Sequence, residues 1–260
     1  MTTLNRRLFA SNLINSCCRD DPSLTKRCLN LSFKNLNKYG NYTPSVAVLL
    51  KVIERNNKNK LIYPEKVVSS SGSVLVIVFD NFVIKLFQNL HTFNRAWKVL
   101  YSIRDENCNH IINMIDYLSM ENKIINVKIH LIVTEKLTPL ITYIHNDRIL
   151  DLKENEIFKL FKDIGIALDC INEYGYVQGD CTLDNIGRID ENFVLFDFNC
   201  ASSIKTRNDD INVLLRSARF NFKNISKKMN EFFNFVKNSK TASHFIDKIY
   251  QYCAEYDIVI

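Results

Sequence analysis

Short apolar runs separated by polar turn residues lie near the middle of the first half of the chain, in a pattern typical of buried β-strands. The runs are rich in Val, Ile and Phe and cover residues 66–68, 74–79 and 82–87, with turn residues at 69–73 and 80–81 between them. Short β-branched and aromatic runs joined by tight turns form hairpins, so we expect three antiparallel strands here.

Longer segments farther along repeat apolar residues every three or four positions, which predicts helices. The pattern is clearest over 156–174, and 91–103 shows it as well. Two strands are predicted between them, at 111–117 and 124–134. A further helix begins at 209–212, and two or three helices complete the chain. The first 60 residues are predicted to be mostly helical.

The stretch 175–201 carries the residues most suited to chemistry. Asp180 is followed five positions later by Asn185, and Asp197 comes directly after the apolar run 193–196, which is predicted to be a buried strand. Two carboxylates and a carboxamide presented in this way are oxygen ligands of the kind that Mg²⁺ prefers. The alternative is that they are ordinary loop residues in a chain rich in Asp and Asn.

This pattern, D-x-x-x-x-N followed by an apolar strand and D-F-x, resembles the catalytic loop and the metal-binding motif of the protein kinase fold. The resemblance implies that Asp180 is the catalytic base and that Asn185 and Asp197 are metal ligands. It also implies ATP and Mg²⁺ as cofactors.

Two departures from the kinase motifs lie in the same stretch. The tripeptide ending at Asp180 is Q-G-D where most protein kinases have H-R-D, and its Gly-Asp pair is similar to the H-G-D of aminoglycoside phosphotransferases and of the small kinases of the tRNA-modification complex. The tripeptide beginning at Asp197 is D-F-N in place of D-F-G. Asn tolerates a left-handed backbone better than other non-glycine residues, so we expect Asn199 to replace that glycine.

The predicted strands resemble the small lobe of the same family. Residues 82–85 match its V-A-I-K pattern, which implies that Lys85 contacts the α- and β-phosphates of ATP. The turn before them is a degraded glycine-rich loop, in which Ser70 and Gly72 would approach the phosphates. Residues 134–137 resemble the hinge, where adenine would bind the backbone at Glu135 and Leu137.

The predicted helix 91–103 stands where the family has its αC helix, yet the glutamate that normally pairs with the strand lysine is missing. The closest position is Ala96. After Asp197, either Asp209 or Asp210 resembles the large-lobe aspartate that holds the catalytic loop; the alternative is a helix N-cap.

Composition adds limits on the class of protein. The chain is 47% hydrophobic and 24% charged, as in ordinary globular domains. No pair among the eight cysteines has disulfide-framework or zinc spacing, and we find neither a signal peptide nor an apolar run long enough for a membrane span. We therefore expect reduced thiols and a cytoplasmic or nuclear location. The net charge is +6, and the excess of Lys and Arg lies toward both ends of the chain. A solvated basic face explains them more simply than a nucleic-acid site.

These observations predict an α+β, two-lobed, protein-kinase-like fold with a β-rich small lobe and a truncated helical large lobe. Residues 1–60 form a basic helical extension, 61–137 the small lobe and 138–260 the large lobe. The expected function is transfer of the ATP γ-phosphate to a Ser or Thr hydroxyl of a protein substrate. The alternatives are a pseudokinase that acts by binding a regulatory partner, and a small-molecule phosphotransferase.

Overall fold

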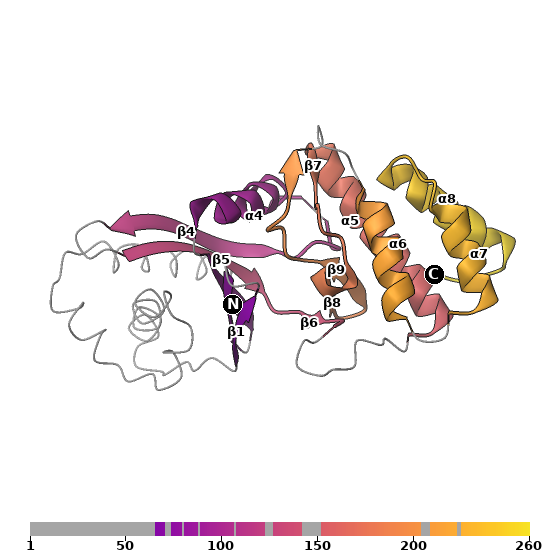
Figure 1. The fold of residues 1–260 in the computed structure, drawn as a ribbon, viewed down its shortest axis with the longest axis horizontal. Helices are drawn as coiled ribbons and strands as arrows, with labels where there is room; N and C mark the ends of the chain where they lie inside the picture. Colours follow the sequence, from indigo (N-terminus) through magenta and orange to yellow (C-terminus); the bar gives the residue numbers. More distant parts are fainter. Residues whose placement is uncertain are drawn as a thin grey trace. The chain divides into compact units, whose positions relative to one another are not determined.

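Antiparallel sheets and five α-helices make up the described part of the chain, so the fold is α+β (Figure 1). The computed structural model describes residues 66–70, 74–79, 81–87, 89–106, 108–122, 127–141, 152–203, 209–222 and 225–260. The predicted extension at 1–60 and the loop residue Gly72 lie outside these ranges. The chain forms two compact units, and the sequence crosses between them at residues 94–95, 113–114 and 136–137.

The first unit contains a five-stranded antiparallel sheet in the order β1-β2-β3-β5-β4. Its strands are β1 (Lys66–Ser70), β2 (Val74–Val78), β3 (Phe82–Phe87), β4 (Met114–Asn122) and β5 (Val127–Glu135). The three strands expected from residues 66–87 are therefore confirmed. Phe79 donates its backbone N–H to the carbonyl of Phe82 at 2.9 Å and stacks on its ring, which closes the predicted tight turn between β2 and β3.

Strand β3, which contains Lys85, is the central strand of this sheet. Ile84 and Leu86 are buried on one face of the strand, while Lys85 lies between them on the other face and is half-buried. Lys85 is opposite Val76 of β2 and Ile132 of β5. The alternation of side chains along a strand thus explains how a charged residue can interrupt an otherwise apolar run.

One strand differs from the prediction at its start. We expected a strand over 111–117, but β4 begins at Met114. Ile111 instead forms a parallel bridge with Leu195, and Ile112 donates its N–H to the carbonyl of Leu195 at 3.0 Å. Residues 95–113 belong to the second unit, so the apolar residues at the start of the run pack there. Sequence alternation alone does not reveal this change of partner.

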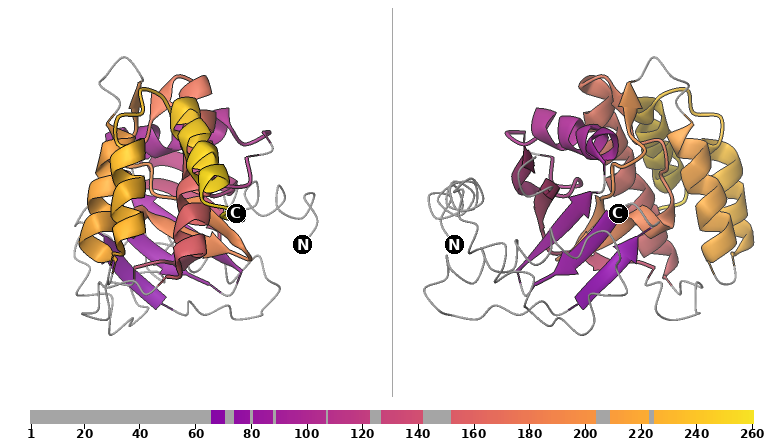
Figure 2. Two further views of the ribbon diagram at one scale, coloured as in Figure 1. Left: turned by 90° about the vertical axis from the view of Figure 1, so that its right-hand side faces the viewer. Right: turned by 60° about the vertical axis from the view of Figure 1, so that its left-hand side comes forward.

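The second unit is built on helix α5 (Glu154–Glu173), with α4 (Leu90–Ser102) entering it at Arg95. The helices α6 (Asp210–Asn221), α7 (Lys227–Val236) and α8 (Ala242–Glu255) follow, as the sequence predicted. Helix α8 packs on α5 and on α7 (Figures 1 and 2). Aromatic side chains from these three helices form the core of their contact: Phe158, Phe161, Phe232, Phe233, Phe245 and Tyr252.

Short strands complete the second unit beside α5. The sheet β6-β8-β9 joins Thr138–Pro139, Ile186–Ile189 and Asn192–Leu195, and β7 (Tyr176–Val177) pairs with β10 (Ser202–Ser203). Strand β9 confirms the buried strand predicted before Asp197. The 3₁₀ turn η2 (Leu183–Asn185) lies between β7 and β8. Because β7 lies at the start of the 175–201 stretch and β10 follows its end, the pairing of these two strands fixes both ends of the stretch.

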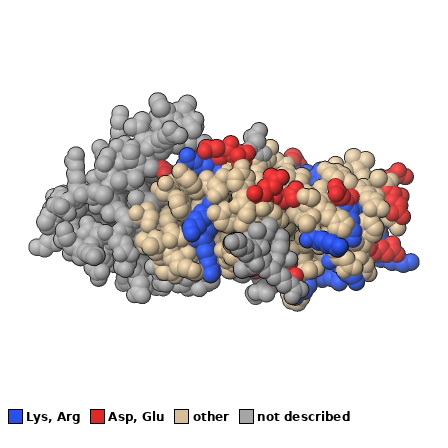
Figure 3. All heavy atoms as spheres, turned by 90° about the horizontal axis from the view of Figure 1, so that it is seen from above, with Lys and Arg blue, Asp and Glu red and all other residues tan. Residues whose placement is uncertain are grey.

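Two surface properties bear on function. No helix in the described part of the chain is long and apolar enough to cross a membrane. Acidic and basic side chains both occur among the described residues on the face drawn in Figure 3. The predicted basic extension lies outside the described ranges, so the expectation of a solvated basic face there stays a prediction.

Candidate functional site

Gln178 joins the two loops that carry the predicted catalytic and metal-binding aspartates. Its side chain is fully buried. Its Nε2 donates to the backbone carbonyl of Asp197 at 2.9 Å, and its Oε1 accepts the backbone N–H of Asp180 at 2.5 Å. One carboxamide therefore uses its donor on one loop and its acceptor on the other. A buried amide is stable only with such partners, so this pairing fixes the two loops side by side.

The loop of Asp180 is also fixed by hydrogen bonds to Asp210. This residue begins α6 and is 3% exposed. Its two carboxylate oxygens accept the backbone N–H groups of Gln178 and Gly179, each at 2.8 Å. Burial raises the pKa of the Asp210 carboxyl, and the two backbone hydrogen bonds oppose that rise. Of the two candidates at 209–210, Asp210 is the one that holds the loop.

Helix α6 contacts the loop at a second point. The hydroxyl of Ser217 accepts the backbone N–H of Leu183 at 3.0 Å. Leu183 is fully buried at the start of the turn η2. Two hydrogen-bonding positions on one helix, about two turns apart, thus fix the loop both before and after Asp180.

Gly179 has a steric reason to be glycine. Its φ is +82°, and a Cβ placed on it would lie 2.5 Å from the backbone oxygen of Cys200. Any other residue would clash with a backbone atom, which cannot move aside as a flexible side chain can. The Gly in the Q-G-D tripeptide is therefore required by the close approach of the two loops, where arginine of the usual kinase motif would not fit.

Asp180 and Asn185, the two polar residues of the predicted catalytic loop, lie side by side. The Asn185 side-chain Nδ2 donates to the Asp180 backbone carbonyl at 2.8 Å and to its carboxylate Oδ2 at 3.1 Å. The backbone carbonyl of Asn185 in turn accepts from Phe196 N–H at 2.9 Å. Because Nδ2 is used toward Asp180, the side-chain oxygen of Asn185 is the atom that can bind a cation.

The Asp180 carboxyl has a raised pKa. Burial is the largest cause, and the negative charges of Asp197 and Asp184 raise the pKa further, while the hydrogen bond from Asn185 lowers it. The charge effect places the Asp197 carboxylate within electrostatic range of Asp180. A carboxylate whose pKa is raised is a stronger base than an ordinary surface aspartate.

The left-handed residue in the D-F-N tripeptide is Asp197, with φ +64°. Asn199 is not among the residues with positive φ, so the expectation that it replaces a left-handed glycine is wrong. The backbone turns two residues earlier than the sequence suggested, shortly after the end of β9. Phe198 is buried, and the side-chain oxygen of Asn199 is buried with no hydrogen-bond partner among the described residues.

A buried polar cluster anchors β9, the strand that leads into Asp197. The carboxylate of Asp163, 1% exposed on α5, accepts the backbone N–H of Phe193 at 3.1 Å and the ammonium of Lys159 at 2.5 Å. His110 Nδ1 donates to the Phe193 carbonyl at 3.2 Å and lies 3.7 Å from the same carboxylate. The strand is thus fixed to α5 by its backbone.

The remaining predicted site residues lie on other segments. Lys85 is in β3 and Glu135 ends β5, both in the first unit, while Leu137 is where the chain returns to the second unit. The Leu137 side chain lies against Gly187, where a Cβ would meet its Cδ1 at 2.5 Å. Ser70 ends β1, and Gly72 is outside the described residues.

The donor atoms near Asp197 suit a hard cation only in part. No group of three or more His, Cys, Asp or Glu side chains among the described residues is arranged to hold a metal ion. The predicted set is smaller, with one carboxylate from Asp197 and one carboxamide oxygen from Asn185. Mg²⁺ bound with nucleotides takes one or two carboxylates and completes its shell with phosphate oxygens and water, so this set fits Mg²⁺ together with a nucleotide.

Two contributions to the site were not predicted from sequence. Gln178 was noted only as a departure from H-R-D, and the bonds from its side chain were not expected. Asp163 was part of an apolar helix pattern and carried no motif. A polar residue at a position that helical or strand periodicity marks as buried is the signal that could have indicated both.

No model of a known protein family matches the sequence, and no curated protein matches it either.

Proposed function

We propose that this chain is a divergent member of the protein kinase superfamily that transfers the γ-phosphate of ATP to a Ser or Thr hydroxyl of a protein. The observation that supports this best is the bridge made by Gln178, which holds the loop of Asp180 beside the loop of Asp197. Phosphoryl transfer requires one residue near the attacking hydroxyl and another near the phosphates, held in fixed relation.

In this proposal Asp180 orients the substrate hydroxyl and accepts its proton. The raised pKa of its carboxyl favours proton acceptance, and the Asn185 amide fixes the side-chain rotamer through Oδ2. One carboxylate oxygen is then directed by Asn185 while the other can face the substrate. A positioned general base contributes about 10²–10⁴-fold to a rate.

Asn185, through its side-chain oxygen, and Asp197, through its carboxylate, are the residues that would hold Mg²⁺. The bound cation would supply charge neutralisation to the phosphates of ATP. The chain's own contribution is to keep these two oxygens in place: the Asp197 backbone is tied to Gln178, and Asn185 is tied to Asp180.

The nucleotide-binding residues of the proposal come from the resemblance. Lys85 would contact the α- and β-phosphates, Ser70 and Gly72 would lie near them, and the backbone at Glu135 and Leu137 would bind adenine. Lys85 alternates with buried neighbours on β3 and is half-buried, which suits a cation that meets a ligand on one face of a sheet.

Two other functions each have an observation in their favour. Helix α4 contains no Asp or Glu, so it offers no carboxylate in the αC position, which favours a pseudokinase that acts through a regulatory partner. The glycine at position 179, required by the Cys200 backbone, is shared with H-G-D enzymes and favours a small-molecule phosphotransferase. For location, we propose the cytoplasm or nucleus, since all five described cysteines are free thiols.

The test is a transfer assay with γ-labelled ATP on the full chain, with Mg²⁺ and separately with Mn²⁺, using generic protein substrates. Asp180→Asn should abolish transfer and leave nucleotide binding intact. Asp197→Asn should weaken Mg²⁺–nucleotide binding strongly, and Lys85→Met should abolish transfer. Asp190→Asn, on the exposed turn between β8 and β9, is the control that should behave as wild type.

Three results would change the assignment. Nucleotide bound without transfer under either metal would support the pseudokinase. Transfer only to small hydroxyl compounds would support the phosphotransferase. Transfer that survives Lys85→Met would show a contaminating kinase or a different lysine, and equal loss of nucleotide binding in Asp180→Asn and Asp197→Asn would show that their roles are misassigned.

A further inference from the structure

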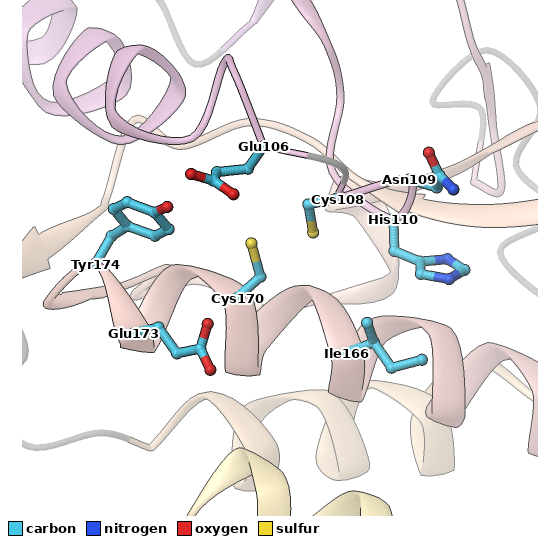
Figure 4. Close-up of a pocket in the computed structure, with 8 residues that line it drawn as sticks. All are labelled: Glu106, Cys108, Asn109, His110, Ile166, Cys170, Glu173 and Tyr174. Carbon is cyan, nitrogen blue, oxygen red and sulfur yellow. The ribbon is translucent and has the colours of Figure 1, made fainter.

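A second site in the second unit contains two cysteines in one cavity. The cavity has a volume of about 410 Å³ and lies between helix α5 and the segment that follows α4 (Figure 4). Cys170 and Glu173 face it from α5, and Glu106 and Cys108 face it from the other side. None of these residues belongs to the Asp180 loop, so the cavity needs its own explanation.

The two thiols are partners. Cys108 and Cys170 both line the cavity, and in Figure 4 their sulfur atoms lie side by side in the gap between α5 and the segment that follows α4. Both residues are half-buried, so the pair can be reached from the cavity while being held by the surrounding chain. Residues 62 positions apart in sequence thus line one cavity.

The surroundings of the pair make its two members different. The hydrogen bond from Cys170 is the largest effect on Cys108 and lowers the pKa of its thiol; a backbone hydrogen bond from His110 acts in the same direction, while burial and Glu173 oppose them. The pKa of Cys170 is raised, first by the same hydrogen bond and then by burial. Cys108 is therefore the more acidic thiol of the pair, and Cys170 holds its proton more tightly. Thiolates react with oxidants, whereas thiols do so slowly.

We propose that Cys108 and Cys170 form a reversible oxidation site that reacts with hydrogen peroxide. The Cys108 thiolate attacks one peroxide oxygen, the O–O bond breaks, and Cys108 becomes a sulfenic acid while hydroxide leaves. Cys170 sulfur then attacks the sulfenic sulfur, an S–S bond forms and the S–O bond breaks with loss of water. Overall, two thiols and one peroxide give one disulfide and two water molecules, and a thiol reductant reverses the change.

The remaining described cysteines lack this arrangement. Cys181 and Cys253 are buried, and burial raises the pKa of each thiol. Cys200 is the most exposed, but burial of its sulfur and the charges of Asp180 and Asp197 raise its pKa as well. Exposure alone would favour oxidation at Cys200, while a lowered thiol pKa together with a neighbouring cysteine favours oxidation at Cys108. These two criteria give opposite predictions and can be separated by experiment.

The carboxylates around the pair define its chemistry further. Glu106 accepts a hydrogen bond from the Tyr174 hydroxyl, which is the largest cause that raises the pKa of Tyr174 to about 12. This engages one carboxylate at the rim, and Glu173 adds a second negative charge nearby. A small neutral oxidant such as hydrogen peroxide can enter past these charges more readily than an anionic disulfide such as oxidised glutathione.

The experiment exposes the reduced, desalted full chain to hydrogen peroxide, blocks remaining thiols by alkylation and maps the peptides by mass spectrometry. In wild type we expect a disulfide between the peptides of Cys108 and Cys170, lost again on reduction. The control Cys200→Ser should form it at the wild-type rate, and Cys108→Ser should not form it. In Cys170→Ser the Cys108 sulfenic acid should accumulate and be trapped by dimedone. Circular dichroism verifies that each variant is folded.

The proposal is overturned if wild type oxidises at Cys200 while Cys108 and Cys170 stay reduced. It is also overturned if Cys108 in Cys170→Ser is no more reactive than Cys200 in the same sample, because the pair would then have no reactive member. Both measurements use peptides of one folded chain, so neither depends on kinase activity.

Discussion

The side chain of Gln178 donates to the backbone carbonyl of Asp197 at 2.9 Å, across a gap of nineteen residues in sequence. The same side chain accepts the Asp180 N–H, so a single buried amide sets the spacing of two loops. Its donor and its acceptor are both required, and no other residue of similar size has both groups in one plane apart from Asn, which is one carbon shorter.

Replacing Gln178 by Met should test this bridge, since Met is similar in length and has neither an N–H donor nor a carbonyl acceptor. Two partners in a buried site lose their hydrogen bonds, so we expect the free energy of unfolding to fall by about 1–3 kcal/mol. Urea denaturation followed by circular dichroism measures this. Gln178→Glu is the second variant: it keeps the acceptor for Asp180 and loses the donor to Asp197. Wild-type stability in Gln178→Met would contradict the bridge.

Asp210→Asn should destabilise the loop of Asp180 much more than Asp209→Asn. Asp210 accepts two backbone N–H groups, and an amide would direct its NH₂ at one of them. We expect a loss of about 1–3 kcal/mol for Asp210→Asn, because one buried donor is left without an acceptor. Asp209 forms no side-chain cap to the helix, so its substitution should stay within about 0.5 kcal/mol.

The measurement is hydrogen exchange of the Gly179 amide, with urea denaturation beside it. Exchange at Gly179 should become faster in Asp210→Asn and stay unchanged in Asp209→Asn. If both variants lose the same stability, the two residues act together as a helix terminus, and the loop-holding role is wrong.

Gly175 and Gly179 have similar positive φ angles, so replacing each by Ala separates the cost of the left-handed backbone from the cost of a steric clash. Gly175 has φ +78° and open space where a Cβ would be, while Gly179 has φ +82° and the Cys200 oxygen 2.5 Å away. Gly175→Ala should cost about 1–2 kcal/mol, the usual penalty of a left-handed L-residue. Gly179→Ala should cost clearly more, because the Cys200 backbone must move as well. Thermal unfolding of both variants gives the comparison, and equal losses would mean that the two loops are farther apart than the structure places them.

Asp180→Asn should raise stability at neutral pH. The folded pKa of Asp180 is raised, chiefly by burial, so the folded state binds its proton more tightly than the unfolded state does. Wild-type stability therefore falls as pH rises from the ordinary aspartate pKa of about 3.9 through the raised value, and the neutral amide has no such loss. The melting temperature of Asp180→Asn should exceed that of wild type at neutral pH, and the difference should shrink as the pH falls toward about 3.9. Asp190→Asn serves as the control, and a variant less stable than wild type at pH 7 contradicts the expected sign.

The sequence was sufficient for elements whose pattern is local. Strand β3 follows from a short aromatic and β-branched run beside a tight turn, and helix α5 follows from apolar spacing; both formed as predicted. The two-residue strands β7 and β10 are too short to carry a pattern. Their existence depends on the pairing of segments about 25 residues apart, which no local window contains.

The candidate site divides in the same way. The motif predicted that Asp180 and Asn185 lie close together, and two hydrogen bonds join them, while their roles in catalysis and metal binding stay predictions. The choice between Asp209 and Asp210 could not be made from sequence, because aspartate suits both a helix N-terminus and a loop anchor. The left-handed position fell on Asp197 and not Asn199, since the end of β9 sets where the backbone turns.

The parallel bridge between Ile111 and Leu195 has a consequence for synthesis of the chain. Ile111 leaves the ribosome roughly 80 residues before its partner, which at about 5–20 residues per second is a delay on the order of 4–16 s. During that interval Ile111 and Ile112, both buried in the finished protein, have no completed strand to cover them. Nascent chains stopped before β9 should therefore bind a holdase chaperone at this segment, and chains long enough to include Leu195 should release it.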